Sequence, residues 1–213
     1  MDCNIDQVLK DEKWKELLQI AKEGLTNDKT GHDYEHTIRV LKNALLISKS
    51  YKVDYDILIA SCLLHDIAYR NGRVKDHHLV GAKIAEEVLD KLNFPKGKIK
   101  KVAIAIEDHV AHMVVAIRKN EDLQIESKIL RDCDNIDAVG SIGLIRMISF
   151  SLSQNIPYFK SKEDRLDETL YGNIKFLLSW PSKMLTFEGE KLGEERVNIL
   201  NEFLEQLEKE AYP

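Results

Sequence analysis

Apolar residues recur three and four positions apart along almost the whole chain, which is the spacing of helices that bury one face. No segment shows the strict apolar–polar alternation, rich in β-branched residues, that predicts a strand. The pattern therefore predicts an all-α protein. Helices are expected at about 5–25, 33–50, 54–69, 77–92, 98–113, 123–136, 164–178 and 190–210, with a further apolar stretch after a break near Gly140 and a loop over 153–162.

The segment 54–69 differs from the others because it is apolar nearly all round. Asp54 is a suitable N-cap for it. A helix without a polar face belongs at the centre of a helical bundle. His65 and Asp66 therefore stand in the most buried part of the predicted fold.

The chain shows no internal repeat and no linker rich in Pro, Gly or Ser. We therefore expect a single domain over residues 1–213. This domain is a helical bundle with a metal-binding core at about 30–140, and it carries a C-terminal helical extension at about 164–210.

The composition and net charge of the chain argue against some classes of binding partner. Hydrophobic residues make up 44%, charged residues make up 31%, and the net charge is −5 with Lys and Arg spread along the chain. No basic stripe is present to neutralise nucleic-acid phosphates, so a long nucleic acid is not expected. The charged N-terminus and the lack of an apolar run of about 18 residues predict a cytoplasmic protein without a membrane span.

The three cysteines are far apart and form no CxxC pair, so neither a disulfide framework nor a thiolate zinc site is indicated.

All seven histidines fall between His32 and His112. Helical phase selects those that face inward. His36 lies on the same apolar stripe as Val40, Ala44 and Ile47. On its own helix, His77 lies closer to the apolar face than His78 does. His109 follows Ile106 by three positions and so shares its face.

Asp134 and Asp137 share a helix face with Leu130, and buried carboxylates are costly without partners. A divalent cation would resolve this cost, because imidazole nitrogens and carboxylate oxygens are suitable ligands. Without thiolates the metal stays open among Mn, Fe, Co, Ni, Zn and Mg.

The His65-Asp66 dipeptide alone carries little weight. A second pair, His32 with Asp33, lies at an expected helix start where Asp33 is a natural cap. The prediction of a metal site depends on the whole ordered set of histidines and carboxylates.

The order His36, His65 with Asp66, then Asp134 resembles the H…HD…D signature of the HD-domain superfamily, whose members are helical metal-dependent phosphohydrolases. Three motifs carry the likeness: GHDYEHTIRVLKNA, LLHDIAY and DCDNIDAVG. The resemblance implies these four residues as metal ligands. The C-terminal part also resembles a branch of small bacterial and archaeal members, some of which hydrolyse nucleoside triphosphates, so a small phosphorylated substrate such as a nucleotide is expected.

The motif HHLVGA resembles one found in two-metal members of the superfamily, which implies His77 and His109 as ligands of a second ion. Asp66 would then bridge the two ions; otherwise the two histidines contact phosphate or transfer protons. Only ten residues separate Asp66 from His77, a short interval for such members, so one ion and two ions both stay open. We assign catalytic roles to Asp66, His77 and His109.

A further cationic set, Arg70, Arg73 and Lys75, follows this motif in a glycine-containing loop and could hold a substrate phosphate; a solvated loop is the alternative. Asp137, Arg39 and Arg131 are either supports of the ligands or members of salt bridges elsewhere.

Two other functions compete with a phosphohydrolase. One is a di-iron oxygenase, because six-ligand sites of this order also occur in oxidative HD-fold enzymes. The other is an inactive regulatory or binding module. The sequence does not fix the oligomeric state, and a homo-oligomer is one of the alternatives.

Overall fold

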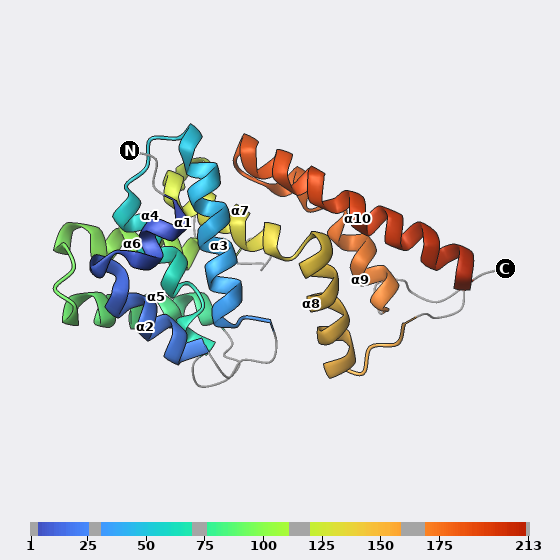
Figure 1. Ribbon diagram of the computed structural model, residues 1–213, viewed down its shortest axis with the longest axis horizontal. Coiled ribbons are helices and arrows are strands. Elements are labelled where there is room, and N and C mark those ends of the chain that lie inside the picture. Colours follow the sequence, from blue (N-terminus) through green and yellow to red (C-terminus); the bar gives the residue numbers. More distant parts are fainter. Residues whose placement is uncertain (1–3, 26–30, 70–75, 111–119, 159–168, 212–213) are drawn as a thin grey trace. The chain divides into compact units, whose positions relative to one another are not determined.

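The structure is a computed structural model that describes residues 4–25, 31–69, 76–110, 120–158 and 169–211. Every regular element within these ranges is a helix, which confirms the all-α prediction (Figure 1). Contacts group the chain into two compact units, Met1–Asp134 and Asn135–Pro213. Each unit is described by itself, and the single-domain organisation stays a prediction.

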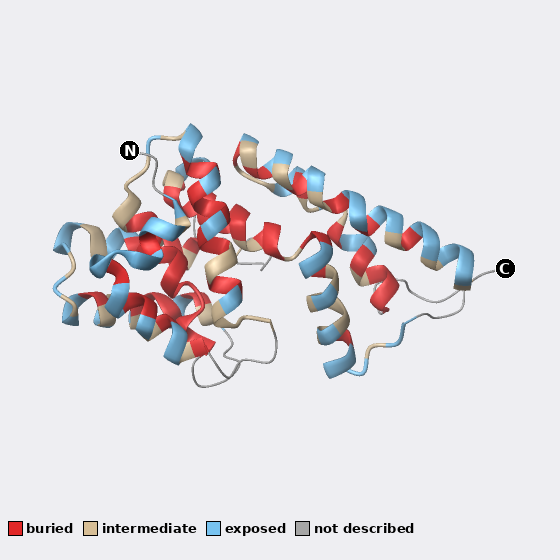
Figure 2. Ribbon diagram, in the orientation of Figure 1, coloured by how far each residue is buried: buried red, intermediate tan, exposed pale blue. Residues whose placement is uncertain are grey.

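In the first unit, helix α4 is the central element. It packs against α2, α3 and α6, and each of its residues from Ile57 to Leu64 is buried (Figure 2). Asp54 caps it by accepting a hydrogen bond from the backbone N–H of Asp56 at 3.0 Å. The first unit contains α1 (Ile5–Lys10), α2 (Glu12–Leu25), α3 (Tyr34–Ile47), η1 (Ser48–Ser50), α4 (Tyr55–Leu64), η2 (Ile67–Tyr69), α5 (His77–Lys91), α6 (Lys96–Asp108), η3 (Asn120–Asp122) and most of α7 (Ile125–Asp137).

The helix expected over 5–25 is two helices, so that prediction was wrong in part. Asp11 has extended backbone angles, and its carboxylate accepts a hydrogen bond from the N–H of Lys13 at 2.9 Å, which caps the start of α2. The break changes the helical phase. Leu9, next to the buried Val8 on α1, is 42% exposed.

The helix expected over 54–69 also ends earlier than predicted. α4 stops at Leu64, with His65 as its C-cap, and the chain then tightens into the 3₁₀ turn η2. This change of pitch falls on His65 and Asp66, so regular helical phase alone cannot place the groups that follow.

Gly81 brings α5 close to this segment. A Cβ at Gly81 would lie 3.2 Å from the backbone oxygen of His65 and 3.5 Å from Ile106. The absent side chain lets α5 approach the end of α4, which is where His77 must reach the site.

The second unit has its own apolar core, to which α9 and α10 contribute Leu170, Tyr171, Ile174, Leu177, Val197, Leu200 and Leu204. Its helices are α8 (Gly140–Ser153), α9 (Leu170–Leu177), η5 (Pro181–Lys183) and α10 (Phe187–Ala211). The expected break near Gly140 is present: α8 begins at this glycine, whose φ of +79° is strained for other residues. Of the segment expected as a helix over 164–178, residues 164–168 lie outside the described part.

No single described helix is long and apolar enough to cross a membrane; α7 and α8 reach the threshold only together, as a bent pair.

Candidate metal centre

His36 lies in the first turn of α3 and is fully buried. Asp33 is the N-cap of this helix, and its carboxylate accepts a hydrogen bond from the backbone N–H of His36 at 2.8 Å. The cap satisfies an amide at the helix start and fixes where α3 begins. The imidazole of His36 is thereby carried into the interior of the first unit.

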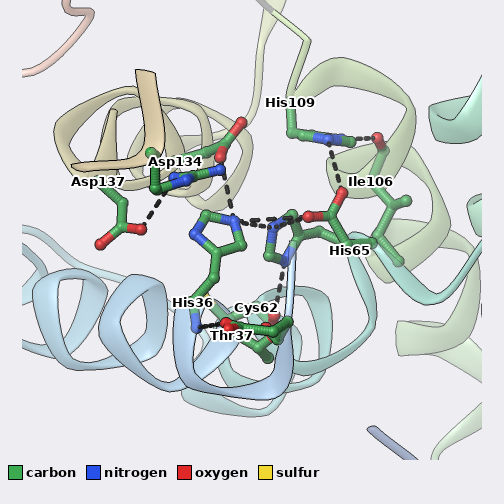
Figure 3. Close-up of polar contacts among 11 residues, drawn as sticks. His36, Thr37, Cys62, His65, Ile106, His109, Asp134 and Asp137 are labelled. Atoms are coloured by element: carbon green, nitrogen blue, oxygen red, sulfur yellow. Dashed lines mark hydrogen bonds and ion pairs between the residues drawn. The ribbon is translucent and has the colours of Figure 1, made fainter. Parts of the chain in front are cut away.

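His65 is fixed by its own backbone. Its Nδ1 lies 2.8 Å from the carbonyl oxygen of Cys62 (Figure 3). Because the carbonyl can only accept, Nδ1 donates the hydrogen bond, and Nε2 is the ring nitrogen that faces the site. His65 Nε2 lies 3.2 Å from His36 Nε2, so two buried ring nitrogens meet at one point.

The carboxylate of Asp66 completes this first group. Its Oδ2 lies 3.4 Å from His36 Nε2 and 3.3 Å from His65 Nε2, yet it makes no hydrogen bond within the described structure. A buried carboxylate oxygen without a donor is costly. Three potential ligand atoms and one orphaned charge therefore share a small volume.

Asp134, from α7, joins the group through His36, whose Nε2 lies 3.3 Å from Asp134 Oδ1. Figure 3 shows the two side chains next to each other. The Asp134 side chain is 25% exposed, unlike the three residues just described. It therefore provides the solvent-accessible side of the first group.

The spacing of these atoms fits a metal ion. Ligands about 2.1 Å from one ion stand roughly 3.0 to 3.4 Å apart in octahedral or tetrahedral arrangements. The distances given above are 3.2 to 3.4 Å, three of them among His36, His65 and Asp66 and one between His36 and Asp134. The ligand atoms of His36, His65 and Asp66 all lie within 4.8 Å of one another, and Asp134 adjoins this group through His36. An ion would also give the orphaned oxygen of Asp66 a partner.

A second group shares Asp66. His109 Nε2 lies 4.0 Å from Asp66 Oδ1, and the ligand atoms of Asp66, His77 and His109 all lie within 4.8 Å of one another. His109 is oriented as His65 is, because its Nδ1 lies 2.6 Å from the carbonyl oxygen of Ile106. The two carboxylate oxygens of Asp66 thus face different groups of histidines.

Burial and charge set the protonation of these groups. Burial raises the pKa of Asp66, but the charges of His65 and His32 hold it well below its usual range. Burial likewise opposes ionisation of Asp134, but hydrogen bonding to His36 and the nearby histidine charges lower its pKa. Both side chains are therefore carboxylates at neutral pH.

The two histidines of the second group are neutral. Burial and the charge of His109 lower the pKa of His77 to about 4, and burial and the charge of His65 lower the pKa of His109. For His65, burial lowers the pKa, but the neighbouring Asp66 outweighs it and raises the pKa. Metal ligands must be deprotonated, and Asp66, Asp134, His77 and His109 already are.

Sequence reasoning missed His32. Asp33 is the helix cap that was expected, but the His32 ring lies 5.8 Å from the His36 ring and 4.8 Å from the Tyr69 ring, between centroids. Helical phase could not have found it, because His32 precedes the N-cap Asp33 and lies outside α3. In the sequence, the pair of His32 with Asp33 is explained by the helix cap alone, so nothing there separately places His32 at the site.

Other predicted residues lie elsewhere. His77, not His78, joins the second group, although His78 is the more buried of the two. Asp137 pairs with Arg146 at 2.9 Å and Arg131 donates a hydrogen bond to Asn120 at 3.1 Å. Arg70, Arg73 and Lys75 lie outside the described residues, as does His112.

These features define a class: an all-helical protein with a buried His and Asp centre suited to a divalent cation. The chain belongs to the HD domain family, whose model matches residues 33–139. HD domains bind divalent metals. The matched segment contains every residue of both groups.

A curated protein and several solved structures resemble this chain over most of its length. The uncharacterized protein YpgQ of Bacillus subtilis is 30% identical over 193 residues, which is 87% of each chain. The crystal structure of an HD-superfamily hydrolase from Bacillus thuringiensis has a TM-score of 0.73 at 26% identity, covering 93% of this chain and 96% of the other. The structure of Bacillus subtilis YpgQ in complex with ADP has the same fold, with a TM-score of 0.70 at 23% identity over 90% of this chain and 96% of that one.

Proposed function

We propose that this protein is a metal-dependent phosphohydrolase that acts on a small phosphorylated substrate, namely a nucleotide. The observation that carries the proposal is Asp66, a buried carboxylate whose two oxygens face two groups of histidines. The relatives support it, since the solved neighbour from Bacillus thuringiensis is an HD-superfamily hydrolase and YpgQ has been solved in complex with ADP.

In this proposal His36, His65, Asp66 and Asp134 would hold one ion, and where a second ion binds, His77 and His109 would hold it together with Asp66. A bound divalent ion supplies an acidified water and offsets the negative charge of the phosphoryl oxygens. Its identity stays open among Mn, Fe, Co, Ni, Zn and Mg.

The protein's own residues prepare the site for this chemistry. The hydrogen bonds of His65 and His109 to backbone carbonyls hold both rings with Nε2 presented, so little reorganisation is needed on binding. His77 and Asp134 are the partly exposed members and face the substrate's approach. Asp66, His77 and His109 are assigned the catalytic roles, and Arg70, Arg73 and Lys75 the binding of a substrate phosphate.

The di-iron oxygenase remains a second candidate, because the sharing of Asp66 between two histidine groups would also suit a pair of iron ions. Iron content together with oxygen consumption would favour it over phosphate release. A regulatory module without turnover is the third possibility. A cytoplasmic location and a possible homo-oligomer belong to the proposal as well.

The deciding experiment is a screen of nucleotides with Mn, Co, Ni and Mg in which both phosphate and pyrophosphate are measured. We expect turnover of at least one nucleotide that chelation abolishes. Asp66→Ala should remove both activity and bound metal, whereas Asp90→Ala, on the exposed face of α5, should change neither. Absence of turnover with every metal would refute the proposed function.

A further inference from the structure

Six aromatic rings form a closed circuit around the metal centre. Neighbouring ring centroids are 5.2, 5.3, 5.3, 4.9, 4.8 and 5.8 Å apart in the order His36, His65, His109, His77, Tyr69, His32 and back to His36. Asp66 lies near His36, His65 and His109 through its carboxylate and forms a group with His77. The circuit therefore contains four candidate ligands and two other rings.

The two other rings, His32 and Tyr69, link the first group of ligands to the second. His32 lies beside His36, and Tyr69 stacks on His77 with an interplanar angle of 25°. His32 belongs to neither group of ligand atoms that lie within 4.8 Å of one another, and a tyrosine hydroxyl is not among the usual ligands of such ions. Their place in the circuit calls for a role other than metal binding.

The solvent exposure of the six rings indicates a role for His32 and Tyr69 in contacting the substrate. His36, His65 and His109 are at most 1% exposed, whereas His32 and His77 are only half-buried. Tyr69 lies between these two histidines and is 8% exposed. His32 and His77 are thus the rings of the circuit that solvent reaches, with the buried Tyr69 between them, and a substrate would approach the centre past these two histidines or past Asp134.

Local backbone structure fixes both rings in this arc. Gly31, with φ of +89°, turns the chain just before His32, and the Asp33 cap fixes the helix start just after it. Tyr69 ends the 3₁₀ turn, and its N–H donates to the carbonyl oxygen of Asp66 at 2.9 Å. Residues three apart in such a turn lie on one face, so Tyr69 stands above Asp66.

We propose that His32 and Tyr69 are a phosphate-contact pair: a ring N–H of His32 and the hydroxyl of Tyr69 donate hydrogen bonds to phosphoryl oxygens of the substrate. A phosphate brought next to the carboxylates of Asp66 and Asp134 needs donors on its remaining side, and imidazole and phenol can both supply them. This inference rests on the proposed function, because it names the residues that hold that function's substrate.

The test uses the full chain loaded with Mn. Binding of inorganic phosphate and of ADP is measured by calorimetry for the wild type, His32→Ala and Tyr69→Phe, with bound metal quantified in each. We expect each substitution to weaken phosphate and ADP binding about tenfold, the worth of a hydrogen bond to a charged group, while the metal content stays unchanged. His32→Gln, which keeps a side-chain N–H donor, should recover part of the affinity.

Two control variants are measured in the same way. Tyr158→Phe removes a hydroxyl from a tyrosine that is 54% exposed in the second unit, and it should bind phosphate as the wild type does. His36→Ala should lose metal as well as phosphate. Tyr69→Phe keeps the ring and its stacking, so this variant reports on the hydroxyl even where His32→Ala impairs folding.

Loss of metal in His32→Ala would make His32 a ligand and overturn the inference, as would unchanged phosphate and ADP affinity in both variants. Absence of any phosphate or ADP binding to the metal-loaded wild type would overturn it too. A wild type that binds ADP but turns over no nucleotide would refute the proposed function alone, and weaker binding in the variants would still support the contact pair.

Discussion

At the scale of single residues, Asp66 is a buried carboxylate with an oxygen that is unsatisfied within the described structure. It is 2% exposed, its Oδ2 has no hydrogen-bond donor, and histidines approach both of its oxygens. Such an arrangement is unfavourable for folding alone, because a buried charge needs compensation. It is favourable when a cation is present.

Metal stoichiometry distinguishes one ion from two. Asp66→Ala should lose all bound Mn, because both groups need this carboxylate, whereas His109→Ala should lose one ion of two, because only the second group contains this residue. Elemental analysis after gel filtration measures both. If His109→Ala and the wild type hold equal amounts of metal, the protein binds a single ion in the first group.

At the scale of secondary-structure elements, close approach of helices decides where the ligands meet. α4 ends at His65, η2 follows, and α5 packs against this segment through Gly81. His77, in the first turn of α5, depends on that approach to reach Asp66. A glycine in the middle of a helix costs roughly 0.5–1 kcal/mol relative to alanine, so its presence at 81 has a packing reason.

Two glycines allow a matched test of this packing. Gly97→Ala should raise the free energy of unfolding by about 0.4–1 kcal/mol, because no atom lies within 4 Å of a Cβ there and the unfolded chain loses freedom. Gly81→Ala should lower it, because the new Cβ would crowd the backbone oxygen of His65 at 3.2 Å. Urea denaturation measures both.

The Gly81→Ala variant should also bind less metal in the second group, since α5 carries His77. A Gly81→Ala protein as stable as Gly97→Ala would show that the approach of α5 is not constrained at this point.

At the scale of the whole molecule, the chain contains two units with separate cores. The metal groups lie in Met1–Asp134, and the core of Asn135–Pro213 is built without any of their residues. Cys62 and Cys133 are buried free cysteines, so hydrophobic packing rather than a disulfide between them stabilises the fold.

Adjacent residues on α10 test the second core. Leu200→Ala should lower the free energy of unfolding by about 2–5 kcal/mol, because Leu200 is 0% exposed in that core. Ile199→Ala, at a position that is 40% exposed, should cost much less. Chemical denaturation followed by circular dichroism compares them.

The folded Leu200→Ala protein should keep the wild-type amount of bound metal, measured on the same samples. Metal loss without unfolding would show that the second core also shapes the metal centre.

The sequence by itself determined the helical class, the burial of α4 and the inward phase of His36 and His109, since these depend on local periodicity. It could not place the break at Asp11 or the 3₁₀ turn after His65, because short turns leave little trace in an apolar pattern. The resemblance of HHLVGA already implied His77 and His109 beside Asp66, but only the tertiary structure showed that the two oxygens of Asp66 face different histidines and that His32 and Tyr69 close the circuit of rings. Those relations join residues on separate helices, and the spacing within one helix does not fix how another packs against it.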